Sequence, residues 1–386
     1  MNELLITNVR VLAEHGAIDG WLLVADGRIA AFGAGAPAPE SLHADVLDLG
    51  GSTVAPGFID VHVHGAVGHE AMDGDPAGLR EMARFFAAHG VTSFLPTTWT
   101  DTRARTLDAL GAIAETMGAV DGGAEILGAH MEGPYLADER CGAQDPAHIR
   151  TAAPDELDAF LATGAPRLMT IAPERVENLR AISACVDAGV TASLGHTDAR
   201  PEQIADAVDR GASHVTHLFN AMRPLHHREL GAVGAILDEP RLRAEVICDL
   251  VHVHPAILRL ALRAKGVDGL VVMTDAVGPT GLDEGTYPLG DRRVRHERGA
   301  MWLEDGTTLA GSALTFDRAV RNLASATGLT IEQLWPACSH NGAVAAGVEQ
   351  RKGRIAVGFD ADLVALDREL RVQATIVGGQ LVHRAG

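Results

Sequence analysis

The residues best suited to chemistry in this chain are histidines and carboxylates that end short apolar runs. The chain has 18 histidines but only nine phenylalanines, four tryptophans and two tyrosines. Imidazole and carboxylate groups together provide the nitrogen and oxygen ligands that suit Zn²⁺ or Fe²⁺. The sequence therefore predicts a divalent metal site, with Zn²⁺ as the favoured ion. Five runs end in this way, in Asp60–His64, His130–Glu132, His196–Asp198, His217–Asn220 and Thr274–Asp275.

Each of these side chains has an ordinary explanation when it is considered alone. His62 and His64 are two residues apart and share one face of a strand, but many His-x-His pairs bind nothing. Glu132 would usually face water at a strand end. His196 and His217 are each compatible with hydrogen-bonded core positions, and Asp275 with a helix cap. We predict a shared site because five separate runs end in metal-binding residue types.

Polar residues beside these run ends give weaker indications. His130 lies two residues before Glu132, so both point to the same face of the strand, with His130 further from the strand end. We therefore expect His130 in the core or against a metal-binding side chain. His214 is expected on the opposite strand face from His217, in a structural role. Asp60 and Asp198 either orient neighbouring imidazoles, as carboxylates near metal ligands often do, or serve surface and capping roles.

Repeated strand and helix patterns indicate how these residues are brought together. Eight apolar runs, each followed by a helical stretch, predict an α/β fold of the (β/α)₈ TIM-barrel type. A doubly wound sheet is the alternative, because strand order is not readable from sequence. Barrel active sites lie at the carboxyl ends of the strands, which would place the five run ends at one mouth. The runs are 58–64, 91–98, 126–132, 168–173, 191–196, 214–219, 245–252 and 269–275.

Both ends of the chain have a different pattern. The first 55 or so residues and the last 40 or so alternate apolar and polar residues with period two, between glycines and aspartates. This pattern predicts short antiparallel strands. We therefore expect a small β-sandwich domain built from residues 1–55 and 348–386, around a catalytic barrel of residues 56–347.

Composition narrows the possible partners and compartment. The chain has 386 residues and a net charge of −19, which disfavours nucleic acid and anionic membrane surfaces. No uncharged apolar run approaches the ~20 residues of a membrane span, and Glu3 with no basic residue before Arg10 is unlike a secretory signal. The four cysteines form no Cys-x-x-Cys pair, so we expect a cytoplasmic protein without disulfides or a thiolate zinc site.

Several longer motifs carry a resemblance to a known family. The chain resembles the N-acetylglucosamine-6-phosphate deacetylases of the amidohydrolase superfamily, in order and over nearly its whole length. The resemblance implies a metal-dependent barrel that removes acetate from an amino sugar phosphate and leaves the free amine. The motifs are PGFIDVHVHG (56–65), HMEGPYLADERCGAQDP (130–146), SLGHTDA (193–199), HVTHLFNAMRPLHHRELG (214–231), VMTDAVGPTG (272–281) and TLAGSALTFDRAVRNL (308–323).

The resemblance also implies roles for the metal-binding residue types. Glu132, His196 and His217 match the ligands of the family's main divalent metal. His62 and His64 match the place where some members hold a second ion, so one or two ions per chain are expected, with Glu132 as the bridging candidate. Asp275 matches the catalytic aspartate, which takes a proton from the attacking water and later gives it to the departing amine. The metal lowers the pKa of its water to about 7.

Substrate contacts follow from the same resemblance. Gln144 stands where several members have a histidine that contacts the acetyl carbonyl; its amide still donates a hydrogen bond but supplies no positive charge. Arg228 matches a phosphate-binding arginine that crosses a dimer interface in some members, which implies a homodimer. Cys141 is expected to be an ordinary loop residue, with a redox or gating role as the alternative. The implied contacts are Ala143, Gln144, Asn220, Ala221, Arg228, His252, Leu309, Ala310 and Gly311.

Three alternatives remain open at this stage. The same site would also suit N-acetylgalactosamine 6-phosphate or another N-acyl amino sugar phosphate. A cyclic-amide hydrolase of the dihydroorotase type would require a bridging lysine, and none stands near Glu132. A catalytically silent barrel that only binds sugar phosphate would be expected to lack Asp275 or a main metal ligand, yet all are present.

Overall fold

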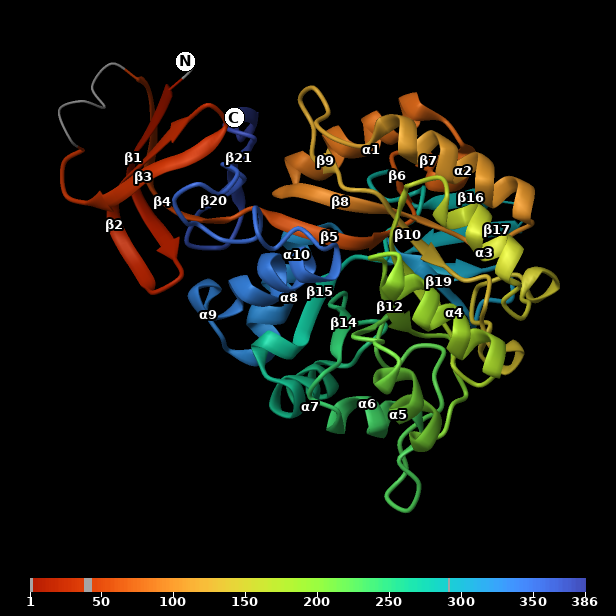
Figure 1. Ribbon diagram of the computed structural model, residues 1–386. Coiled ribbons are helices and arrows are strands. Elements are labelled where there is room, and N and C mark those ends of the chain that lie inside the picture. The colour runs from red at the N-terminus through yellow and green to blue at the C-terminus, as the bar shows by residue number, and fades with distance from the viewer. Residues whose placement is uncertain (1–2, 38–43, 291) are drawn as a thin grey trace.

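The middle of the chain forms a barrel of parallel strands. The computed structural model describes residues 3–37, 44–290 and 292–386 (Figure 1). The strands pair in chain order, and the amide of Asp275 donates to the carbonyl of His62 at 2.9 Å where the last strand meets the first. This order confirms the predicted (β/α)₈ barrel over a doubly wound sheet, in which the order reverses. The strands are β5 (Phe58–Val63), β8 (Val91–Thr98), β10 (Ala129–Glu132), β11 (Pro166–Ile171), β12 (Thr191–Leu194), β13 (His214–Val215), β14 (Arg243–Ile247) and β15 (Leu270–Met273).

Helices surround the barrel and have clear start and stop signals in the sequence. Four of them begin with a proline, whose fixed φ suits the first helical turn. Asp75 caps α1 by accepting from the amides of Ala77 and Gly78 at 2.9 and 3.1 Å, and Gly328 ends α8 with a φ of 76°. The helices are α1 (Pro76–Ala88), α2 (Arg103–Thr116), α3 (Pro154–Leu161), α4 (Val176–Asp187), α5 (Pro201–Asp209), α6 (Gly231–Asp238), α7 (Pro255–Lys265), α8 (Phe316–Thr327), α9 (Ile331–Trp335) and α10 (Asn341–Ala345).

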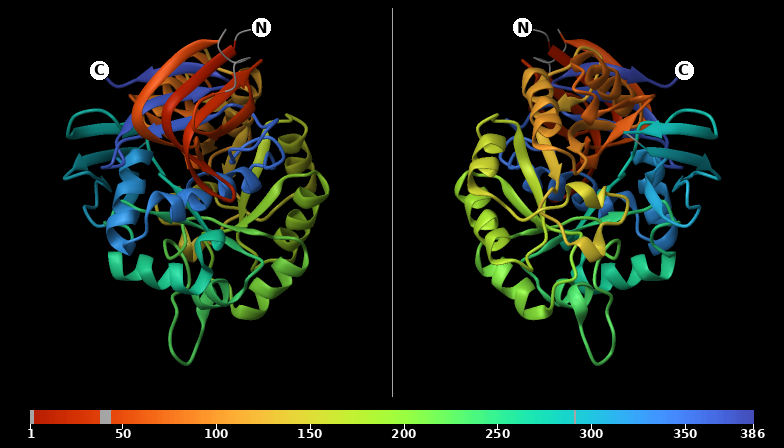
Figure 2. Two further views of the ribbon diagram at one scale, coloured as in Figure 1. Left: turned by 90° about the vertical axis from the view of Figure 1, so that its left-hand side faces the viewer. Right: turned by 90° about the vertical axis from the view of Figure 1, so that its right-hand side faces the viewer.

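The two ends of the chain meet in one seven-stranded sheet, at the left of Figure 1 and the top of Figure 2. The sheet curls over a single apolar core, and the amide of Ile29 donates to the carbonyl of Phe359 at 2.9 Å. The prediction of antiparallel strands was incomplete, because β1 and β4 pair in parallel. In sheet order the strands are β22 (Gln380–Arg384), β21 (Val372–Val377), β20 (Leu363–Leu366), β4 (Asp45–Pro56), β1 (Glu3–Ala13), β2 (Gly16–Ala25) and β3 (Arg28–Ala34).

A third sheet, absent from the predictions, is inserted after β15. Its four antiparallel strands are β16 (Gly285–Leu289), β17 (Arg292–Glu297), β18 (Ala300–Leu303) and β19 (Leu309–Ser312). Strand β19 returns to the barrel, where the amide of Ser312 donates to the carbonyl of Asp275 at 2.7 Å. The insertion thereby brings residues 309–312 to the carboxyl ends of the barrel strands. Short strands also occur at β6 (Gly65–Ala66), β7 (His69–Glu70) and β9 (Glu125–Ile126).

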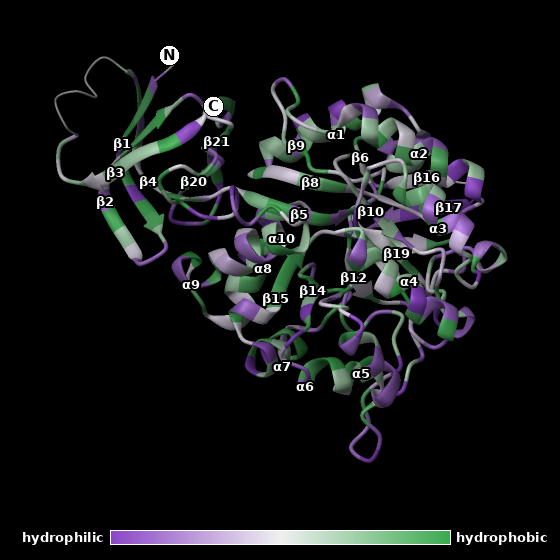
Figure 3. Cartoon of the chain, in the orientation of Figure 1, coloured by the Kyte–Doolittle hydropathy of each residue, from purple (hydrophilic) through white to green (hydrophobic). Residues whose placement is uncertain are grey.

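Burial explains why the barrel strands were readable. Every residue of β5, β8 and β15 is buried, as expected for parallel strands covered on both faces. Figure 3 shows the resulting hydrophobic colour on β5 and β15, against more hydrophilic outer loops and helix faces. Among the helices of the described residues, none has the length and apolar character needed to cross a membrane.

Candidate metal and substrate site

Backbone conformation turns three of the predicted residues toward the barrel mouth. His196, His217 and Asp275 each lie two residues beyond the end of a strand, after β12, β13 and β15. Their φ angles are 47°, 30° and 52°. Left-handed conformations are uncommon outside glycine and cost on the order of 1–3 kcal/mol each. Strain repeated at three strand ends of one barrel is characteristic of a functional site.

The main predicted cluster converges in space. The Oε1 atom of Glu132 lies 3.1 Å from Nε2 of His196 and 2.9 Å from Nε2 of His217. The two Nε2 atoms are themselves 3.0 Å apart. All three side chains are buried. The expected convergence of these three groups from separate strands is therefore confirmed, and one cation placed among them would touch all three.

The second predicted pair lies directly beside this cluster. The Nε2 atoms of His62 and His64 are 3.3 Å apart. Nε2 of His62 is 3.5 Å from Oε1 of Glu132, and Nε2 of His64 is 3.3 Å from Oε2 of the same carboxylate. Glu132 thus faces both histidine pairs, as expected of a bridging carboxylate.

Hydrogen bonds at the far side of the rings fix which nitrogen faces the cluster. Because carbonyl and carboxylate oxygens only accept, Nδ1 carries the hydrogen in these rings and Nε2 presents its lone pair inward in the neutral form. Converging lone pairs repel unless a cation lies between them. Three imidazoles have such an acceptor: Glu245 Oε2 at 2.9 Å from Nδ1 of His62, the Thr97 carbonyl at 3.1 Å from Nδ1 of His64, and the Arg140 carbonyl at 2.8 Å from Nδ1 of His196.

Electrostatics also favour positive charge at this position. Burial by itself lowers the pKa of His64, but the carboxylates of Asp275 and Glu132 outweigh it and raise that pKa to about 9. Burial acts to raise the pKa of Glu132, yet His62 and His196 hold it well below its usual range, so this carboxyl is ionised. The site thus stabilises positive charge, which protons or a divalent cation can supply. The donor set and its geometry fit a divalent metal.

Asp275 is placed at the edge of this cluster. Its Oδ1 atom lies 3.4 Å from Nε2 of His64 and 3.6 Å from Nε2 of His62. Burial raises the pKa of Asp275, but His62 and His64 outweigh this effect and leave it below its ordinary value. The side chain is therefore ionised at neutral pH and able to accept a proton.

A cavity of about 280 Å³ opens onto the main cluster of Glu132, His196 and His217 and onto Asp275. Ala310 is fully buried behind its neighbours and does not line it. Cys141 is half-buried in the loop beside it, outside the lining among the described residues. Seven of the nine predicted substrate contacts do line the cavity, together with the main cluster and Asp275: Ala143, Gln144, Asn220, Ala221, His252, Leu309 and Gly311.

Arg228 is the ninth predicted contact, and it lies elsewhere. It belongs to the loop of residues 223–230, which projects from the barrel between β13 and α6 (Figures 1 and 2). There it lines a separate hollow with His226 and His227. Within a single chain the structure does not bring Arg228 to the cavity, and its predicted reach into a neighbouring subunit stays a prediction.

Gln144 has a partner that the sequence did not indicate. Its Nε2 group donates to Oε2 of Glu132, and its Oε1 atom accepts from the amide of Thr100 at 2.7 Å. A glutamine amide carries two N–H hydrogens. One is thus directed at the Glu132 carboxylate, and no acceptor among the described residues bonds the other.

The two aspartates proposed to orient imidazoles do not contact those rings. Asp60 accepts from the hydroxyl of Thr274 at 2.6 Å, and burial raises the pKa of this carboxyl to about 7. Asp198 pairs with Arg140 at 2.7 Å and Arg223 at 3.4 Å. Of the two roles left open for each aspartate, orientation of a neighbouring ring is wrong for both. Asp60 instead bonds Thr274 just after β15, and Asp198 has a surface role between Arg140 and Arg223.

Two residues near the histidines were missed. Glu245 accepts from His62, and its only sequence signal was a charge at the start of the predicted run 245–252. Trp99 stacks on His64 with ring centroids 3.7 Å apart and donates its indole hydrogen to Glu70 at 2.8 Å. Its signal was one aromatic residue directly after a predicted strand. The expected core role of His130 is confirmed, since its ring bonds the Val61 carbonyl at 3.0 Å and the Thr170 hydroxyl at 2.7 Å.

Comparison with known proteins agrees with this architecture. The sequence pattern described as "Amidohydrolase family" matches residues 53–382. The chain belongs to the amidohydrolase family. Its relatives include the N-acetylglucosamine-6-phosphate deacetylase of Lysinibacillus sphaericus, 36% identical over 98% of this chain and 97% of that protein. The protein of the same name from Homo sapiens is 39% identical, over 88% of this chain and 85% of its own length.

Solved structures of this amidohydrolase branch superpose closely on the chain. A mutant of the Mycobacterium smegmatis N-acetyl-D-glucosamine-6-phosphate deacetylase, in complex with N-acetyl-D-glucosamine-6-phosphate, has a TM-score of 0.92 at 35% identity, covering 99% of this chain and 100% of that one. The Thermotoga maritima deacetylase has a TM-score of 0.89 at 33% identity, covering 99% and 100%. The resemblance seen in the sequence motifs is thereby confirmed.

Proposed function

We propose that this amidohydrolase hydrolyses the N-acetyl group of N-acetylglucosamine 6-phosphate, producing glucosamine 6-phosphate and acetate in amino sugar catabolism or recycling. The observation that carries the proposal is the convergence of Glu132, His196 and His217 beside Asp275, in one cavity at the barrel mouth. Relatives that carry the deacetylase name match the chain over 98% of its length.

The metal sites are proposed from the same geometry. Glu132, His196 and His217 would hold the main divalent ion, and His62 and His64 would hold a second one with Glu132 between them. Their nitrogen and oxygen donors favour Zn²⁺, with Fe²⁺ as the other fitting ion. When bound, the ion supplies a Lewis acid and lowers the pKa of a water molecule to about 7.

The chain's own residues then handle protons and position the substrate. Asp275, which is ionised before the reaction, accepts the proton of the attacking water and delivers it to the amine nitrogen as the amide bond breaks. The free N–H of Gln144 donates to the acetyl oxygen as negative charge develops on it. His252, held by Asp249 through a 2.7 Å bond to Nδ1, would contact the sugar.

We propose a homodimer in which the phosphate is bound from two sides. The backbone of Asn220 and Ala221 would contact it within the cavity, and Arg228 would enter the cavity of a second copy. Arg228 suits this role because its planar guanidinium forms paired hydrogen bonds with phosphate oxygens. The loop that carries it exposes Leu225 (53%) and Leu230 (46%), apolar side chains that an interface would cover.

We propose that the protein is cytoplasmic, because of the state of its cysteines. The four cysteines are free thiols rather than disulfide partners. Such thiols persist in a reducing compartment.

Acetate release from N-acetylglucosamine 6-phosphate by the purified full chain tests the function. The protein is assayed as purified, after treatment with a strong chelator, and after Zn²⁺ is restored. We expect activity to be lost and then regained. Activity that persists unchanged after chelator treatment would contradict the metal-dependent mechanism. Parallel kinetics with N-acetylgalactosamine 6-phosphate test the choice of substrate. A higher kcat/KM for that epimer would contradict N-acetylglucosamine 6-phosphate as the preferred substrate.

A further inference from the structure

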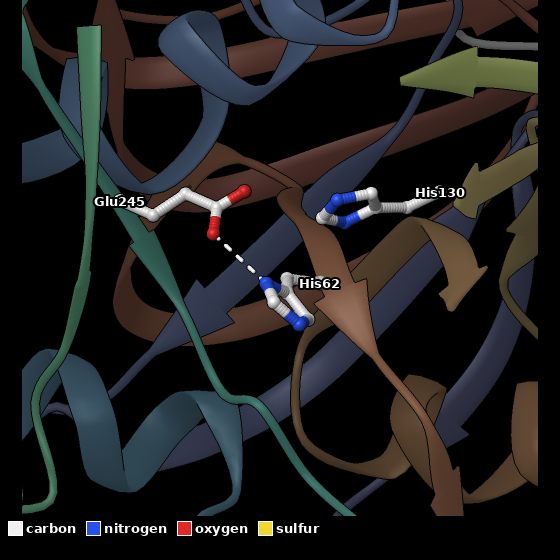
Figure 4. Close-up of side chains that lie close together, drawn as sticks. All are labelled: His62, His130 and Glu245. Carbon is white, nitrogen blue, oxygen red and sulfur yellow. Dashed lines mark hydrogen bonds and ion pairs between the residues drawn. The ribbon is translucent and has the colours of Figure 1, made fainter. Parts of the chain in front are cut away.

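We infer that Glu245 is a positioning residue that sets His62 to hold the second ion, an inference that rests on the proposed metal-dependent function. Glu245 lies on β14, and its side chain reaches past β15 toward His62 on β5 (Figure 4). It is 0% exposed and does not line the cavity, so it has no direct access to substrate.

Three hydrogen bonds hold the Glu245 carboxylate. Oε2 accepts from Nδ1 of His62 at 2.9 Å and from the backbone amide of His217 at 3.0 Å. Oε1 accepts from Nε2 of His214 at 3.0 Å. These bonds fix the orientation of the carboxylate. They also join His62 to the strand end that carries His217.

This contact decides what His62 can do. A carboxylate at Nδ1 keeps the hydrogen on that nitrogen, so Nε2 has its lone pair free toward Glu132 and His64. Without the acceptor, the hydrogen is free to move to Nε2 and the ring is free to rotate, and either change removes a ligand. Carboxylates that hold a ligating histidine commonly contribute 10–100-fold to metal affinity.

The trio of His62, His130 and Glu245, drawn in Figure 4, is not itself interpreted as a metal site. The three side chains lie close enough to share an ion. However, both ring nitrogens of His130 are occupied, by the Val61 carbonyl and the Thr170 hydroxyl. His130 instead packs edge-on against His62, with ring centroids 4.5 Å apart. Its replacement is therefore a matched control.

Variants of Glu245 separate reach from charge. Glu245→Gln keeps the length, and its amide oxygen still accepts from His62 if its nitrogen faces His214. Glu245→Asp keeps the charge but withdraws the carboxylate by one methylene. Glu245→Leu removes the acceptor. His130→Gln alters the neighbouring ring without touching Nδ1 of His62.

The test is the number and affinity of Zn²⁺ ions bound per chain, measured by elemental analysis and competition with a chromophoric chelator. We expect two ions in the parent chain. Glu245→Leu and Glu245→Asp should weaken the second ion 10–100-fold and change the first by less than about threefold, whereas Glu245→Gln should weaken it less than about tenfold. His130→Gln should leave both unchanged.

Several results would overturn the inference. These are a parent chain that takes only one ion at saturation, a Glu245→Asp variant with both affinities intact, equal weakening of both ions, and equal weakening by His130→Gln. If Glu245→Leu does not fold, as judged by circular dichroism, the Asp and Gln variants still decide. A parent chain that binds two ions but releases no acetate would contradict the proposed function and leave this inference standing.

Discussion

Replacing Asp275 with asparagine should abolish most turnover while leaving both the fold and the metal site intact. The backbone of Asp275 is fixed independently of its carboxylate, by a 2.9 Å bond from its amide to His62 and a 2.7 Å bond from the amide of Ser312 to its carbonyl. Asparagine fills the same volume beside His62 and His64. The proposed main ligands Glu132, His196 and His217 come from other strands of the barrel.

The magnitude follows from what the amide cannot do. Asparagine does not accept the proton of the attacking water, so it cannot return that proton to the amine. Proton transfer by a positioned side chain contributes roughly 10²–10⁴-fold, or about 3–5 kcal/mol of transition-state stabilisation. We therefore expect Asp275→Asn to lower kcat for acetate release about 10³-fold, with KM within about threefold.

Asp317→Asn is the matched control for this assay. Asp317 lies on α8, where it pairs with Arg321 at 2.8 Å and His89 at 3.1 Å, away from the cavity. The control should keep full activity. Both variants should retain the parent's metal content by elemental analysis. A value of kcat for Asp275→Asn within tenfold of the parent, at equal metal content, would refute the proton-transfer role.

Three other substitutions test separate parts of the account. Arg228→Ala should raise KM for the phosphorylated sugar at least tenfold with little change in kcat; an equal loss with unphosphorylated N-acetylglucosamine would disprove the phosphate contact. Gln144→Leu should lower kcat by about 10²-fold through loss of an oxyanion donor, and an unchanged kcat would exclude that role. Lys352→Met should lower the free energy of unfolding in urea by about 3 kcal/mol, because Lys352 is buried against Glu125 at 2.7 Å and Asp362. Burial lowers the pKa of Lys352, but Asp362 and Glu125 raise it above its ordinary 10.5. The difference in free energy of unfolding between parent and variant should therefore persist to about pH 10.5 and shrink at higher pH. A difference that shrinks below about pH 9 would contradict this.

The barrel was predictable because its strands are buried on both faces. Continuous apolar runs such as Leu270–Met273 stand out from the amphipathic, glycine-ended helices between the strands. The inserted sheet was not predicted, because strands such as β17 mix exposed arginines with single buried residues and have no strong period. Parallel pairing of β1 with β4 depends on tertiary contacts, which local patterning does not encode.

The residues of the candidate site were likewise predictable where local sequence pattern positions them, and not where tertiary contacts do. His196, His217 and Asp275 were identified because a strand end fixes where each side chain points. Glu245 was missed because its role depends on crossing the barrel interior to another strand, a contact between residues 183 positions apart. The choice between an orienting and a surface role for Asp198 was left open, because adjacency to a histidine in sequence does not fix where the side chain points.

The most direct measurement of the central claim is anomalous X-ray scattering, at the zinc absorption edge, from crystals of the Zn²⁺-loaded protein. The account predicts a strong peak in contact with Glu132, His196 and His217, and a second one beside His62 and His64. A map without a peak among Glu132, His196 and His217, in protein that releases acetate, would contradict it.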